Sequence, residues 1–165
     1  MKELLVELFG QSGNGFIILG MIVNVLLGGI GSAKGLRIAA TQTAGIMSEK
    51  PELFGKLFVL MVLPGTQGFY SFIASFLAGL QTFLGNKETS FVGAIGLMIL
   101  LIVMGFVEFV TAIEQGKTSA AAINMVAKQE RTFGQAIIMP ALVETYAVLG
   151  LLISIIVILS INLIK

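Results

Sequence analysis

Four long apolar segments follow one another along the chain, separated by short polar breaks. Uncharged runs extend from Leu8 to Ala33, from Leu57 to Asn86 and from Thr89 to Val107. A fourth apolar segment, Thr132 to Ile164, contains a single charged residue, Glu144. Since a helix needs roughly 20 apolar residues to cross the bilayer hydrocarbon, the pattern predicts four transmembrane helices. They are expected at about residues 12–47, 52–84, 89–127 and 131–164.

Short connections and an internal repeat indicate two helical hairpins in tandem, residues 1–86 and 87–165. Helices joined by short loops are antiparallel neighbours. Phe54-Gly55 opens the second span, and Phe133-Gly134 opens the fourth; the same offset aligns Gly65 with Glu144. Such self-similarity indicates duplication of a hairpin, with both copies crossing the membrane in the same direction.

Basic residues predict the orientation. In most membrane proteins, the cytoplasmic side carries more lysines and arginines than the other side. Here Lys2, Lys87 and Lys165 lie toward one side, and the rest lie toward the first and third connections: Lys34, Arg37, Lys50, Lys56, Lys117, Lys128 and Arg131. We therefore expect a multi-pass cell-membrane protein with loops 48–56 and 128–131 in the cytoplasm and both termini outside. The first apolar run lacks an obvious cleavage site, which favours a retained helix.

Composition supports a membrane protein and excludes several chemistries. Hydrophobic residues make up 56% of the chain, charged residues make up 12%, and the mean hydropathy is +1.00. A net charge of +1 gives no basic surface for nucleic acid. Without Cys or His, the chain has no disulfide, thiolate nucleophile, imidazole base or ordinary zinc site.

Small residues recur at one-turn spacing in the first and third spans, which predicts close helix approach. They are Asn24, Gly28, Gly31, Gly35 and Ala39, then Ala112, Gly116 and Ala120. Any membrane bundle uses such spacing. Its presence on alternate spans nevertheless favours an inner layer of tightly packed helices.

Polar residues gather at one predicted depth near the bilayer centre. Glu144 lies about 20 Å along its helix from Arg131. Folding the hairpins brings Thr66, Gln67 and Gln115 to a comparable level. An intramembrane carboxylate must be protonated, paired or occupied by a cation, and is a functional candidate by default.

The ligand types favour a hard cation, because carboxylate, amide and hydroxyl oxygens suit such ions. A proton needs only the carboxylate, so the extra oxygens favour Na⁺ over H⁺, which remains the alternative. Pro64, Gly65 and Gly68 loosen the second span and leave main-chain carbonyls available. Pro140 either does the same beside Glu144 or is an ordinary proline kink.

Four motifs carry a resemblance that covers nearly the whole chain. They are Gly-Ser-Ala-Lys-Gly at 31–35, Leu-Pro-Gly-Thr-Gln-Gly-x-Tyr at 63–70, Gln-Gly-Lys at 115–117 and Val-Glu-Thr-Tyr-Ala-x-Leu-Gly at 143–150. In this order and on these spans, the chain resembles the subunit K proteolipids of V-type sodium ATPases.

The resemblance implies a rotor-ring subunit, many copies of which form a closed ring that carries one Na⁺ per protomer. Its implied ligands are the Leu63 backbone carbonyl, the Thr66, Gln67 and Gln115 side chains, and the Glu144 carboxylate. Tyr70 would hydrogen-bond Glu144 and lock the occupied site. Implied partners are a stator subunit with an arginine, central-stalk subunits at the cytoplasmic loops, and membrane lipid.

Nucleotide hydrolysis is expected in partner subunits, because this chain has no phosphate-binding loop and hence no catalytic site of its own. Glu108 and Glu114 depart from the family pattern. Glu108 is interpreted as a protonated ring-packing residue, as a residue bound to lipid in the ring lumen, or as part of an exit route for the ion, and the structural interpretation is favoured. Glu114 is expected to pair with Lys117 or to alter the site indirectly.

Two other classes of protein compete with a rotor ring. A four-helix multidrug exporter would also use a membrane-embedded glutamate, but the chain has no Trp and two Tyr, which is poor for an aromatic drug pocket. A structural pore or membrane-adhesion protein would not need Thr66, Gln67, Gln115 and Glu144 at one level.

Overall fold

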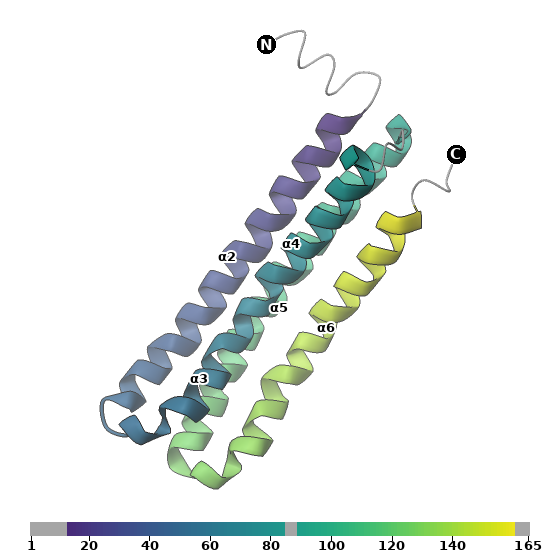
Figure 1. The fold of residues 1–165 in the computed structure, drawn as a ribbon. Coiled ribbons are helices and arrows are strands. Elements are labelled where there is room, and N and C mark those ends of the chain that lie inside the picture. Colours follow the sequence, from purple (N-terminus) through teal and green to yellow (C-terminus); the bar gives the residue numbers. More distant parts are fainter. Residues whose placement is uncertain (1–12, 85–88, 161–165) are drawn as a thin grey trace.

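The computed structural model describes residues 13–84 and 89–160, and these residues form an elongated bundle of long helices (Figure 1). Helix α2 spans Asn14–Met47, α3 spans Phe54–Val62 and α4 spans Thr66–Gly79. Helix α5 spans Phe91–Lys128, and α6 spans Phe133–Ser160. Short helical turns lie at Pro51–Leu53 (η1), Leu63–Gly65 (η2), Leu80–Leu84 (η3) and Glu130–Thr132 (η4).

Within the described residues, four helical segments are long and apolar enough to cross a membrane. They are Asn14–Met47, Pro51–Phe83, Phe91–Lys128 and Glu130–Ser160. The chain is thus an all-α membrane protein, as the apolar pattern predicts. The boundary at 86/87, the lysines at positions 2, 87 and 165, and the amino-terminal residues behind the retained-helix prediction lie outside the described residues.

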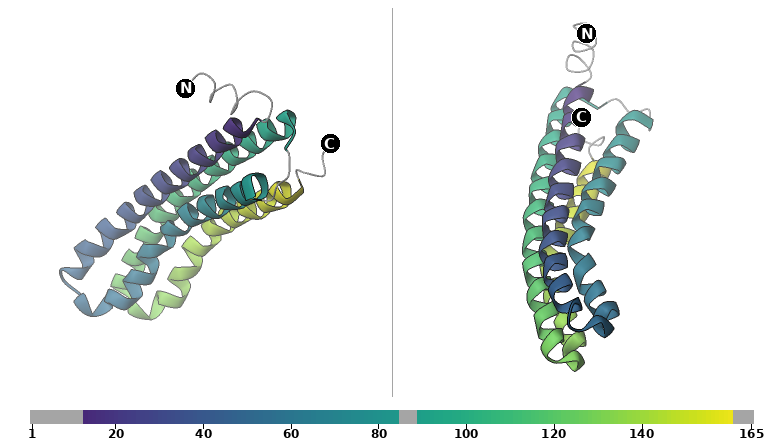
Figure 2. Two further views of the ribbon diagram at one scale, coloured as in Figure 1. Left: turned by 45° about the horizontal axis from the view of Figure 1, so that its top comes forward. Right: turned by 90° about the vertical axis from the view of Figure 1, so that its left-hand side faces the viewer.

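The helices run side by side, and the first and third of the four spans make the most extensive contact (Figure 2). Glycines permit this approach of α2 to α5, because a Cβ on Gly116 would lie 2.5 Å from the Cα of Gly35. A Cβ on Gly31 would lie 2.6 Å from the Cα of Phe109. Gly31, Gly35 and Gly116 of the predicted small-residue stripe therefore lie at this contact, whereas Gly28 faces α4.

Local sequence explains where the helices begin and break. The Ser90 side chain accepts a hydrogen bond from the Gly93 N–H at 3.2 Å and caps α5. Pro64 lacks a backbone N–H, and the second span tightens there into the 3₁₀ turn η2 between α3 and α4. Pro140 is accommodated inside α6, which continues through it.

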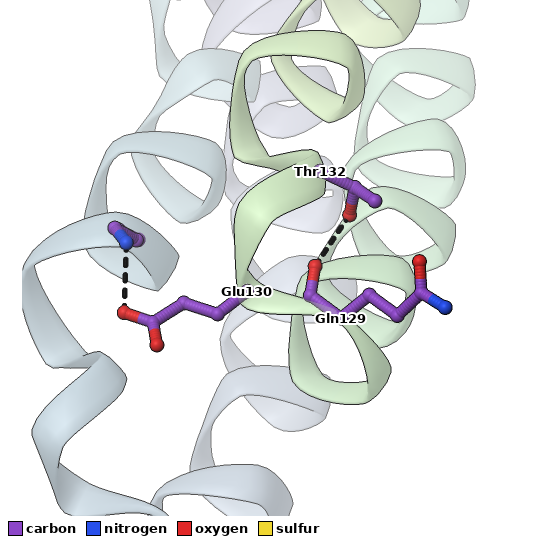
Figure 3. Close-up of polar contacts among 4 residues, drawn as sticks. Gln129, Glu130 and Thr132 are labelled. Carbon is purple, nitrogen blue, oxygen red and sulfur yellow. Dashed lines mark hydrogen bonds and ion pairs between the residues drawn. The ribbon is translucent and has the colours of Figure 1, made fainter.

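The connection between α5 and α6 is tied to the first hairpin. Thr132 Oγ1 donates a hydrogen bond to the Gln129 carbonyl at 2.7 Å, and Glu130 pairs with Lys56 Nζ at 2.7 Å (Figure 3). Lys50 Nζ also donates a hydrogen bond to the Ala127 carbonyl at 2.6 Å. These exposed contacts hold the two connections together at one end of the bundle.

Two apolar clusters fill the bundle and leave a polar level between them. One cluster, nearer the start of α2, includes Ile17, Leu97, Leu101 and Ile158. The other, nearer the connections, includes Leu57, Leu60, Ala122, Ile123 and Ala136. Along α4, α5 and α6, the residues between these clusters include Gln67, Gln115 and Glu144.

Candidate ion-binding site

The turn η2 supplies main-chain and side-chain oxygens at mid-span. Thr66 Oγ1 donates a hydrogen bond to the Leu63 carbonyl at 3.0 Å and lies 3.4 Å from Gln67 Oε1. The Thr66 N–H also bonds the Leu63 carbonyl across the 3₁₀ turn. Three oxygens, one each from Leu63, Thr66 and Gln67, therefore gather where Pro64 interrupts the span.

Gln115 links this turn to the fourth span. Its side chain is fully buried, and its Oε1 accepts a hydrogen bond from Gln67 Nε2 at 2.5 Å. Its Nε2 donates to the Pro140 carbonyl at 3.1 Å and to Glu144 Oε2 at 3.3 Å. Gln115 thus joins α4 to α6 through the middle of the bundle.

Besides the hydrogen bond from Gln115, Glu144 receives one from a residue of the first hairpin. Tyr70 Oη donates to Glu144 Oε1 at 2.6 Å, so both carboxylate oxygens have a donor. Within residues 13–84 and 89–160, the ion pairs are Lys56–Glu130 and Lys117–Glu114. No cationic side chain of this part of the chain therefore neutralises Glu144.

The structure brings the predicted side chains into one connected group. Hydrogen bonds link Thr66 to Gln67, Gln67 to Gln115, Gln115 to Glu144, and Tyr70 to Glu144. The Leu63 carbonyl joins through Thr66. Such a group offers carboxylate, amide, hydroxyl and main-chain oxygens, a ligand set typical of hard cations.

One supporting residue has no role in the sequence prediction. Ser32 Oγ on α2 accepts a hydrogen bond from the Gly68 N–H at 2.8 Å, beside Gln67. Ser32 belongs to the Gly-Ser-Ala-Lys-Gly motif at 31–35, and this motif is the sequence feature that could have identified it as part of the site. Its contact supports the backbone directly after the interruption at Pro64.

The two additional glutamates of α5 behave differently from each other. Glu114 is exposed and pairs with Lys117 at 2.7 Å, so the predicted pairing is confirmed. Glu108 is fully buried inside the protomer, and neither carboxyl oxygen has a hydrogen-bond partner among residues 13–84 and 89–160. This burial excludes the interpretation of Glu108 as a lipid-facing residue of a ring lumen.

The surface of the bundle around the site carries exposed, mainly apolar side chains. Phe69 and Tyr146 are 70% and 67% exposed, and Leu142 is also exposed. These residues neighbour Tyr70 and Glu144 along α4 and α6. Large exposed apolar surface on a membrane helix suits lipid or another copy of the chain.

Comparisons with known proteins agree with this arrangement. The family model for the C subunit of ATP synthase matches residues 19–78 and 94–157, which cover most of each hairpin. The chain is 36% identical over 145 residues to the V-type sodium ATPase subunit K of Enterococcus hirae, covering 88% of this chain and 91% of that protein. It is 35% identical over 131 residues to the A-type ATP synthase subunit K of Methanocaldococcus jannaschii, covering 79% of this chain and 58% of that protein.

Proposed function

This chain belongs to the ATP synthase C-subunit family, and we propose that its homo-oligomeric ring binds one Na⁺ per protomer at Glu144 and carries the ion as it turns. Membership makes the chain a rotor-ring subunit of a V- or A-type ATPase complex. The identity of the ion and the roles of individual residues are the proposal.

The observation that carries the proposal is the oxygen-rich group around Glu144. Leu63 O, Thr66 Oγ1 and Gln67 Oε1 lie together, and Gln115 connects them to the carboxylate. Rotating the Gln115 amide by half a turn would exchange its oxygen and nitrogen and present the oxygen to a cation beside Glu144. Similarity to a protein named as a sodium ATPase subunit also favours Na⁺.

Charge neutralisation explains how the site carries an ion past the lipid. An empty, ionised Glu144 facing hydrocarbon is costly, whereas a carboxylate paired with Na⁺ is tolerated, so only loaded sites pass through lipid. A stator arginine near Glu144 would favour the empty carboxylate and release the ion. Moving each ion against 100 mV costs about 2.3 kcal/mol, which partner subunits must supply from ATP.

The orientation proposed for the ring follows the basic residues. In or beside the connections that follow α2 and α5 lie Lys50, Lys56, Lys128 and Arg131. Both connections are at the same end of the bundle (Figure 1). The positive-inside rule favours that end in the cytoplasm, where central-stalk subunits would bind the loops.

A proton is the second candidate ion. Tyr70 and Gln115 both donate to Glu144, so the hydrogen-bond group is complete without a metal ion. A proton-carrying ring would need no oxygens from Leu63, Thr66 or Gln67. The exporter interpretation is set aside, because the chain belongs to the ATP synthase C-subunit family.

Carbodiimide labelling of the purified ring separates the two ions, since this reagent modifies protonated carboxyl groups. Sodium is titrated at fixed pH, and the rate of Glu144 modification is measured. Protection of Glu144 by Na⁺, but not by K⁺ at equal ionic strength, is expected. Labelling that is indifferent to Na⁺ and falls as pH rises would assign the site to protons.

A further inference from the structure

Arg37 of α2 is an exposed cation without an acidic partner among residues 13–84 and 89–160. It lies ten residues before the end of α2, which is about 15 Å inside the helix. Lys34, one turn earlier, lies over the Phe109 ring of α5 with Nζ 5.1 Å from the ring centroid. A charged side chain at membrane depth is costly and normally pairs with another group. Arg37 is therefore the cation of this level that needs a partner outside its own protomer.

Arg37 and Glu114 leave the α2/α5 pair on opposite flanks. Gly35 lies at the contact of these helices, where an added Cβ would collide with the Ala112 carbonyl. A Cβ on Gly116 would likewise lie 2.5 Å from the Gly35 Cα. Arg37 follows Gly35 by two residues, which is about 200° round α2 from the contact. Glu114 is two residues from both Ala112 and Gly116, so it is also about 200° round α5 from the contact.

The two side chains also lie at one depth. Gly35 is level with residues 112–116, and Arg37 is about 3 Å further along α2. Rotation about the axis of a membrane ring keeps the depth of every residue, so Arg37 of one protomer is level with Glu114 of the next. In a closed cyclic ring, each protomer presents one flank to the opposite flank of its neighbour. Such contact brings an arginine flank to a glutamate flank.

The surface beside Arg37 suits the close approach of a neighbouring helix. Ala33 and Gly29 precede Arg37 by one and two turns, and both are exposed. A Cβ on Gly29 would meet no described residue within 4 Å. Small residues allow membrane helices to approach closely, so this flank of α2 can receive a second helix as its other side receives α5.

We propose that Arg37 of each protomer pairs with Glu114 of the next protomer, and that the flanks carrying these two residues form a contact of the ring. Glu114 accepts a hydrogen bond from Lys117 through Oε1, and its Oε2 has no partner in the described part of the chain. An arginine guanidinium bonds such a carboxylate more strongly than a neutral donor does. The contact depends on the ring that family membership implies, and it is independent of which ion binds at Glu144.

Cross-linking of the intact, detergent-solubilised ring tests the contact, because the chain has no cysteine of its own. The double variant Arg37→Cys/Glu114→Cys is treated with a short bis-maleimide, whose reach matches an arginine and a glutamate side chain laid end to end. Each protomer then links to both neighbours, and denaturing electrophoresis is expected to show a ladder of multimers. Either single variant gives dimers at most, because one thiol per protomer cannot extend a chain.

A second cysteine pair controls for specificity. Phe106 is exposed on α5 eight residues before Glu114, which is about 12 Å toward the start of that helix. Arg37→Cys/Phe106→Cys is therefore expected to give no ladder. The proposal is overturned if the Arg37/Glu114 pair gives no ladder, if both pairs give ladders of equal yield, or if both thiols are consumed in a band of monomer size.

Charge exchange provides the second readout. Arg37→Glu and Glu114→Arg alone each place like charges together, and each is expected to lower the temperature at which the ring dissociates. The double exchange restores an opposite pair and recovers most of the loss. A lipid partner is distinguished by comparing rings in phosphatidylcholine vesicles with and without phosphatidylglycerol. Destabilisation by Arg37→Gln that appears only with phosphatidylglycerol, beside a silent Glu114→Gln, assigns Arg37 to an anionic headgroup and overturns the pair.

Discussion

Tyr70 Oη lies 2.6 Å from Glu144 Oε1, so the phenol of α4 donates a hydrogen bond to the only carboxyl side chain of α6. The bond crosses between the two hairpins. It holds the carboxylate toward the bundle while Gln115 donates to the other oxygen. Together the two donors fix the orientation of the Glu144 carboxyl group.

Replacing Tyr70 by Phe should weaken sodium binding at Glu144. The substitution keeps the aromatic ring and removes only the hydroxyl donor. A hydrogen bond to a charged group contributes about 1.5–3 kcal/mol, which corresponds to roughly a 10- to 100-fold rise in the sodium concentration for half-protection. Carbodiimide labelling of Glu144 during a sodium titration measures the shift.

Tyr146→Phe is the matched control for that experiment, since Tyr146 is exposed on α6 two residues after Glu144. Its half-protection concentration should stay at the wild-type value. Equal shifts for Tyr70→Phe and Tyr146→Phe would contradict a specific role of the Tyr70 hydroxyl.

Gln115→Ala should weaken sodium binding at least as strongly. The change removes the side chain that bonds Gln67, Pro140 and Glu144, and it takes the acceptor away from the amide nitrogen of the fully buried Gln67. An unpaired buried group costs about 1–3 kcal/mol. We expect a tenfold or larger loss of sodium protection, measured by the same labelling, with exposed Gln135→Ala unchanged. Wild-type protection in Gln115→Ala would remove Gln115 from the site.

The depth of the site is predictable from the sequence, whereas its supporting contacts are not. Helical rise is regular and the connections are short, so counting from Pro51, Lys128 and Arg131 places Gln67, Gln115 and Glu144 at one level. The apolar runs likewise predict the four membrane-spanning helices. These inferences need only length and spacing.

Rotation of each helix about its axis depends on packing, so the sequence alone does not predict which neighbours a given side chain meets. Glu108 left three interpretations open, and the structure buries it against Gly150. The sequence predicts no role for Ser32, because its contact with the Gly68 N–H requires α2 and α4 to meet at that point. The hydrogen-bond direction of the Gln115 amide likewise follows from its neighbours.

Gly116→Ala should destabilise the ring, because the added methyl group would lie 2.5 Å from the Cα of Gly35. Backbone cannot move aside as a flexible side chain can, and overpacking costs about 1–3 kcal/mol. The temperature at which the solubilised ring dissociates should fall. Gly134→Ala is the control, because its Cβ would meet no described residue within 4 Å. Equal stability of both variants would contradict the close approach of α2 to α5.

Ser32→Ala should weaken sodium binding from a position on a different helix. Ser32 Oγ accepts the Gly68 N–H at 2.8 Å, and Gly68 directly follows Gln67. Losing the acceptor costs about 1 kcal/mol, or about a fivefold rise in the sodium concentration for half-protection of Glu144. In Ser48→Ala, by contrast, the lost hydroxyl donates to the Ala44 carbonyl one turn earlier, at the end of α2 and away from the site, and no shift is expected. If both serine variants protect Glu144 like the wild type, the Ser32 contact does not help to position Gln67. Both variants lose a serine hydroxyl, but only Ser32 contacts Gly68. A shift confined to Ser32→Ala would therefore show that α2 supports the site through this contact.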